Sequence, residues 1–87
     1  MNAVVEKSVY EQVVAATYGY LGPAAERFVT REVKAHIGKE PEELTKADVA
    51  KLVDWSKLAI ALLTDNSKMV EEYADDLLAI ANGEKMT

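Results

Sequence analysis

His36 and Glu32 are the two residues best spaced for chemistry, because they lie one helical turn apart. His36 is the only histidine in this chain of 87 residues, and side chains at positions i and i+4 of a helix are neighbours. An imidazole beside a carboxylate can act as an acid–base pair or supply two ligands to a metal ion. A zinc site needs three or four ligands, and no third ligand has matching spacing. We therefore expect a structural or surface role for His36, with no metal or cofactor bound.

Other residue types that carry chemistry do not form a known catalytic pattern. Gly19 and Gly22 follow no strand and precede no Lys–Ser/Thr pair, so they do not make a phosphate loop. The serines lack the flanking residues of a nucleophile motif. Neighbouring carboxylates on a helix point in different directions, and no loop has the spacing of a calcium-binding hand. The sequence therefore predicts a protein without catalytic residues.

Two groups of side chains are candidates for binding instead. Arg27, Arg31 and Lys34 follow steps of four and three, so they share one helix face, which we call the basic ridge. Three charges without neighbouring aromatic residues do not favour nucleic acid as a partner. The second group consists of amphipathic aromatic residues, which are enriched at binding sites but also lie at the edges of small cores. Its members are Tyr18, Tyr20, Trp55 and Tyr73.

Apolar residues at helical spacing occur in four segments, and no segment alternates as a strand does. Ser8 with Glu11, and Thr45 with Asp48, have the spacing of capping boxes and predict two helix starts. Gly22 stands at a sharp corner where we expect a positive φ angle. The expected helices cover residues 8–21, 23–37, 45–63 and 67–82.

These segments predict an all-α fold, a small four-helix bundle with a long central third helix. A chain of this length has room for one domain, so residues 1–87 form a single helical domain. Residues 1–7 and 84–87 are expected to be frayed, since chain ends without packed apolar residues are poorly ordered.

Composition restricts the surroundings and partners. The formal net charge is −5 and 49% of the residues are hydrophobic, which is typical of a folded domain and unfavourable for binding anionic membranes or nucleic acid. The chain has no cysteine, which favours a reducing cytoplasm. The longest apolar run, residues 58–63, is too short to span a membrane, and the start MNAVVEKS lacks the pattern of a signal peptide.

The stretch LGPAAERFVTREVKAHIG, followed by PEELTKADVAKLVDW, resembles a small helical module of prokaryotic regulatory and signal-transduction proteins. The shared features are Leu21-Gly22-Pro23, a helix ending near Gly38 and an entry into a long helix from Pro41 to Asp48. The resemblance covers about residues 13–81. It implies a regulatory or interaction role and brings no catalytic residues with it.

The third helix has more apolar residues than one buried face needs. One row, which covers the other helices, consists of Val49, Leu52, Val53, Ala59, Ile60 and Leu63. Trp55, Leu58 and Leu62 form a second row, and exposed rows of this kind commonly mark interfaces. We therefore predict an interaction module that forms a homodimer on this row.

Three alternatives to the dimer remain open. The first helix of the same chain can cover the second row and leave it no partner to bind. A sensor of small molecules is possible, with a pocket between the third and fourth helices lined by Trp55, Leu58 and Tyr73. The third alternative is a nucleic-acid accessory protein that uses the basic ridge.

Overall fold

The computed structural model describes residues 8–83, and all regular elements in this part of the chain are helices. The α-helices are α1 (Val9–Leu21), α2 (Ala25–His36), α3 (Lys46–Ala61) and α4 (Ser67–Ala81), with short 3-10 turns at Gly22–Ala24 and Pro41–Glu43. The predicted all-helical class is thus confirmed. Residues 1–7 and 84–87, for which frayed ends are predicted, lie outside the described residues.

The prediction of four separate helices, with the third as the long one, does not match the structure. The 3-10 turn Gly22–Ala24 joins α1 to α2 without an intervening loop, and the chain bends at Gly22, whose φ of 61° is not helical. The described residues therefore form three helical segments, the first of them long and bent, plus the 3-10 turn at Pro41–Glu43. Pro23 lies inside the bend, so α2 begins two residues later than predicted. A proline fits there because its missing N–H is not needed in the first turn of a helix.

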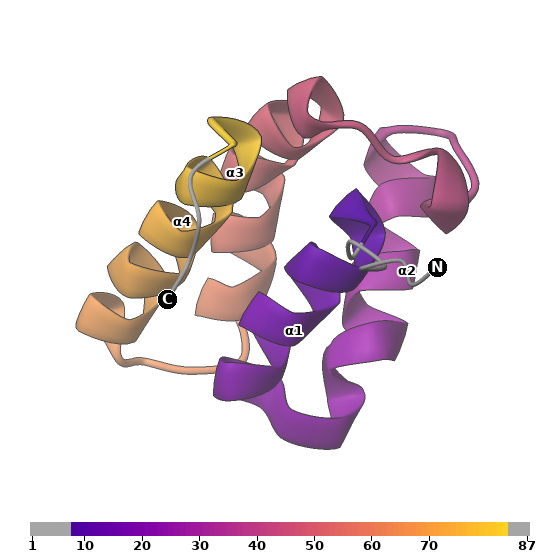
Figure 1. Ribbon diagram of the computed structural model, residues 1–87. Coiled ribbons are helices and arrows are strands. Elements are labelled where there is room, and N and C mark those ends of the chain that lie inside the picture. Colours follow the sequence, from indigo (N-terminus) through magenta and orange to yellow (C-terminus); the bar gives the residue numbers. More distant parts are fainter. Residues whose placement is uncertain (1–7, 84–87) are drawn as a thin grey trace, which may run out of the picture.

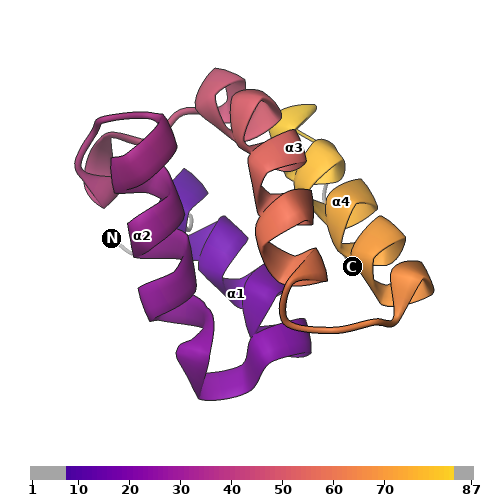
Figure 2. The same ribbon diagram turned by 180° about the vertical axis from the view of Figure 1, so that it is seen from behind.

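The helices surround a shared core (Figure 1). α1 packs against α2 and α4, and α3 packs against the same two helices from the other side. Seen from behind, α3 lies in front between α2 and α4 (Figure 2). One side of α3 therefore faces the core, and the opposite side faces away from the three other helices.

Local capping fixes the starts of α1 and α3 where the sequence predicts them. The backbone N–H of Glu11 donates to the Ser8 hydroxyl at 3.1 Å, and the backbone N–H of Ser8 donates to the Glu11 carboxylate at 2.9 Å. Thr45 and Asp48 make the same reciprocal pair at the start of α3. Each pair satisfies N–H groups that the first turn of a helix leaves without partners.

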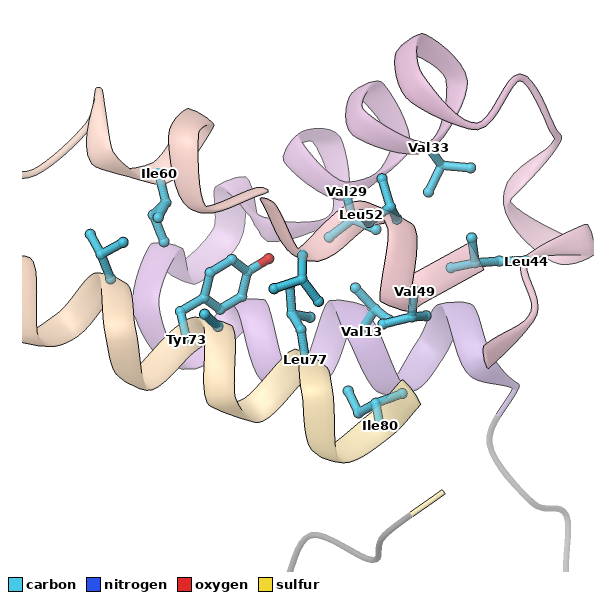
Figure 3. Close-up of a cluster of buried hydrophobic side chains, with 13 residues drawn as sticks. Val13, Val29, Val33, Leu44, Val49, Leu52, Ile60, Tyr73, Leu77 and Ile80 are labelled. Carbon is cyan, nitrogen blue, oxygen red and sulfur yellow. The ribbon is translucent and has the colours of Figure 1, made fainter. Parts of the chain in front are cut away.

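Side chains from all four helices meet in one continuous core (Figure 3). The largest of these side chains is Tyr73 of α4, which is 1% exposed. The core also contains Val13, Val29, Val33, Leu44, Val49, Leu52, Val53, Ile60, Val70, Ala74, Leu77 and Ile80. Within residues 8–83, no helix combines the length and the apolar character needed to cross a bilayer.

Candidate functional site

Three large apolar side chains of α3 face away from the core, and we call them the outer row: Trp55, Leu58 and Leu62. Their spacing of three and four residues places them along one side of the helix. Trp55 is 49% exposed, Leu58 62% and Leu62 87%. The opposite side of α3 is buried through Val49, Leu52, Val53, Ser56 and Ile60. α3 therefore has two apolar sides, and the described residues fully cover only one of them.

The predicted burial of Leu63 is wrong, because this side chain is 63% exposed. α3 ends at Ala61 with Leu62 as its C-cap, so the helical spacing that assigns Leu63 to the buried side stops before it. The exposed Leu63 follows directly after Leu62. It therefore adds apolar surface at this end of α3.

His36, the last residue of α2, stacks on Trp55. Their ring centroids are 4.3 Å apart and the ring planes are inclined by only 5°. Trp55 is thus held from one side by α2, while about half of its surface stays exposed. The sequence singles out both residues separately but does not indicate their contact, because no local spacing joins residues of different helices.

Glu32 lies one turn before His36 in α2 and has a buried carboxylate. Its Oε1 is 3.6 Å from His36 Nε2, and the side chains of Glu32 and His36 are 11% and 28% exposed. This distance suits an ion pair when the imidazole is protonated but is too long for a hydrogen bond. Glu32 Oε1 has no hydrogen-bond partner among residues 8–83. Glu32 and His36 lie next to each other, as their spacing in the sequence predicts. Nothing in the sequence indicates that Glu32 is buried.

Tyr73 belongs to the core and not to the surface. Its phenol oxygen lies 2.7 Å from the hydroxyl of Thr17 on α1. Burial raises the pKa of the Tyr73 phenol to about 12, and the negative charge of Glu32 acts in the same direction. Tyr73 therefore does not offer surface to a partner, and it cannot line a surface pocket together with the exposed Leu58.

Of the other predicted interface residues, Tyr20 has a side chain that packs partly buried against the core, whereas the side chain of Tyr18 is exposed. The Tyr20 hydroxyl donates to Asp76 Oδ2 at 2.6 Å, and its ring meets the Tyr73 ring edge-on at 5.2 Å. Burial raises the pKa of Tyr20 well above its usual value, and the hydrogen bond to the Asp76 carboxylate and its charge add to this. Tyr18 is 58% exposed on α1. The predicted aromatic group thus divides between core and surface.

The basic ridge is exposed along α2, as its spacing predicts. Arg27 and Arg31 line an open depression together with Pro23, Ala24, Glu26 and Thr30. Glu26 brings a negative charge into this depression, which weakens its attraction for phosphate. Within the part of the chain that is described, no three His, Asp or Glu side chains come together in a way that could hold a metal ion.

The edge of α3 next to α4 is polar. Lys57 of α3 and Glu71 of α4 form an ion pair at 3.3 Å, and both side chains are at least one third exposed. An exposed pair of this kind contributes little to stability, about 0 to 1 kcal/mol. The ion pair of Lys57 and Glu71 does place charges beside the outer row. Protein interfaces commonly have a polar border of this kind around an apolar centre.

The sequence was compared with models of protein families, with curated proteins and with solved structures. No model of a protein family matches the sequence, and neither a curated protein nor a solved structure matches it.

Proposed function

We propose that the protein is a non-enzymatic interaction module that forms a homodimer through the outer row of α3. The observation that carries this proposal is the exposure of Trp55, Leu58 and Leu62 along one helix. Contiguous apolar surface of this kind is rare on monomers, and burying a Leu side chain completely contributes about 1.5–3 kcal/mol. A twofold contact buries the row of each copy against the other.

The order of side chains along α3 fits a second copy packed antiparallel. If the twofold axis passes at Leu58, residues equally distant from Leu58 on either side face each other across the contact. Trp55, three residues before Leu58, then faces Ala61, three residues after it. A large side chain thereby meets a small one, which is how packed helices interdigitate.

A regulatory role for this module, in a prokaryotic cytoplasm, is supported by the resemblance of residues 21–38 and 41–55 to a helical module of regulatory proteins. A self-associating domain suits such a role, since it lets protein concentration control activity. The buried positions of Leu52, Ser56 and Ile60 also favour this proposal over an arrangement in which α1 covers the outer row.

The test is the molecular mass in solution, measured by light scattering after gel filtration at micromolar concentration. Wild type is expected to be a dimer, and Leu58→Glu a folded monomer because Leu58 is exposed. Leu78→Glu is the matched control, since Leu78 is 42% exposed but lies on α4. A monomeric wild type, or dissociation caused by Leu78→Glu, would overturn the proposed interface.

A further inference from the structure

We propose that His36 of α2 is a positioning residue for the outer row: its imidazole holds the indole of Trp55 in the orientation that a second copy of the chain binds. This role in self-association rests on the dimer proposed above. It makes the contact depend on a residue of α2, although the row itself belongs to α3. The effect of His36 on Trp55 lies within one chain and can be measured without a dimer.

The two rings lie face to face where α2 meets α3. Their centroids are 4.3 Å apart and their planes are inclined by 5°. Stacked aromatic rings attract each other, and this attraction needs no charge on the imidazole. His36 therefore covers one face of the Trp55 indole, while 49% of Trp55 stays exposed to a partner.

His36 can hold Trp55 because His36 is itself held. The helix that carries it, α2, packs against α1, α3 and the 3-10 turn Pro41–Glu43. His36 is the last residue of α2, and its side chain is 28% exposed. Its Nε2 lies 3.6 Å from Oε1 of Glu32, whose side chain is 11% exposed. The imidazole thus has neighbours on two helices that limit its movement.

Trp55 differs from the other two members of the outer row in this support. Leu58 and Leu62 are 62% and 87% exposed, so little of the chain surrounds them. Trp55 is the most covered of the three, and its ring is restrained by a second helix. Tryptophan is among the residue types that most often dominate the energy of an interface. A large side chain that is already in place avoids the loss of conformational freedom that binding otherwise requires. Trp55 is therefore the anchor of the contact, and His36 prepares it.

The affinity of the dimer, measured by sedimentation, tests this role. Ordering one side chain at an interface costs about two- to tenfold in affinity. The dimer contains two copies of Trp55, so His36→Ala is expected to weaken it about fivefold or more. Alanine is the best helix former, and the variant should fold. His36→Phe keeps a flat ring beside the indole and should restore the affinity of wild type. Lys34→Ala is the matched control, since Lys34 is exposed on the same helix.

A double variant separates positioning from direct contact between His36 and the partner. Trp55→Leu keeps an apolar side chain in the outer row but offers no ring on which His36 can stack. If His36 acts through Trp55, adding His36→Ala to Trp55→Leu costs no further affinity. An equal loss in both backgrounds would show that the imidazole touches the partner itself and would overturn the positioning role. A wild-type dimer that His36→Ala leaves unchanged would overturn it too.

The mobility of the indole can be followed in a monomer, because Trp55 is the only tryptophan in the chain. In Leu58→Glu, the fluorescence anisotropy of Trp55 should decay mainly with the tumbling of the whole protein. Adding His36→Ala should introduce a fast component from side-chain motion, which His36→Phe should not show. A decay that is the same with and without the imidazole would overturn the positioning by His36. A monomeric wild type would instead overturn the dimer, so the two failures can be told apart.

Discussion

The phenol oxygen of Tyr73 on α4 lies 2.7 Å from the hydroxyl oxygen of Thr17 on α1, and both side chains are buried. The Thr17 hydroxyl donates its single proton to the carbonyl oxygen of Val13, also at 2.7 Å. Tyr73 must therefore be the donor to Thr17. This buried hydrogen bond joins α1 to α4 inside the core.

Tyr73→Phe is expected to destabilise the protein by about 1–2 kcal/mol, the usual cost of removing one partner from a buried hydrogen bond. Thr17→Val should have a similar effect, because it removes the acceptor of the buried phenol. The double variant should cost less than the sum of both, since it removes donor and acceptor together. Urea unfolding of the four proteins measures this, and strictly additive losses would contradict the pairing.

Alkaline conditions should weaken the fold through the buried phenol of Tyr73 and the partly buried phenol of Tyr20. The pKa of Tyr73 is raised to about 12 and that of Tyr20 is raised too, both chiefly by burial. A folded-state pKa above the unfolded value of about 10 means that stability is complete below pH 10 and is lost as the pH rises through the folded-state value. Melting temperatures should thus fall above about pH 10. The fall should be shallower in Tyr73→Phe than in wild type, and an unchanged slope would count against the buried phenol as its cause.

Asp48 should support the fold at neutral pH and lose this effect in acid. Its Oδ2 accepts from Lys39 Nζ at 2.8 Å and from the backbone N–H of Thr45 at 3.0 Å. The hydrogen bond from Lys39 is the main reason why the pKa of Asp48 lies below its usual value. A lowered pKa means that the stabilisation exists above the unfolded value and disappears as the pH falls through the folded one.

The variant Asp48→Asn is expected to cost about 1–3 kcal/mol at neutral pH, because it removes the negative charge that pairs with Lys39 and strengthens both hydrogen bonds to this side chain. As the pH falls through the folded-state pKa of Asp48, both proteins come to carry an uncharged side chain at this position, so their stabilities should converge. Denaturant unfolding as a function of pH, from neutral into acid, provides the measurement. A difference that stays constant with pH would show that shape rather than charge explains the loss.

Two glycines at the end of α1 offer a matched pair. Gly22 has a φ of 61°, as the corner in the sequence predicts, whereas Gly19 lies inside the helix. A Cβ added at either position meets no atom within 4 Å, so only the backbone distinguishes them. Gly22→Ala should destabilise by about 1 kcal/mol or more, and Gly19→Ala should stabilise by about 0.5–1 kcal/mol. Thermal unfolding decides this, and a stabilising Gly22→Ala would be incompatible with the bend.

Local signals made part of this fold predictable. Capping depends on residues three positions apart, so Ser8 with Glu11 and Thr45 with Asp48 identify their helix starts from sequence alone. Helical spacing also separates Trp55, Leu58 and Leu62 from the buried side of α3, although it does not tell whether another helix covers this second row. Both are properties of a single segment and need no knowledge of its neighbours.

Features that depend on contacts between segments were not predictable. Leu63 was assigned to the core because its spacing is right, yet α3 ends before it. Nothing in the sequence indicates that Glu32 is buried, since a carboxylate is normally exposed and its burial depends on how α2 packs against other helices. The ion pair of Lys39 with Asp48 and the stacking of His36 on Trp55 likewise arise only when distant segments pack.

The chain enters α3 through two capping boxes in succession, and this bears on how the protein folds. Glu40 with Glu43 closes the first around the turn Pro41–Glu43, and Thr45 with Asp48 closes the second, with the buried Leu44 between them. The slow step of helix formation is its first turn, which fixes several dihedral angles for one hydrogen bond. Here that step needs contacts within only nine residues, 40–48. The first turn of α3 therefore draws its stabilising hydrogen bonds from its own segment and needs no contact with another helix to form.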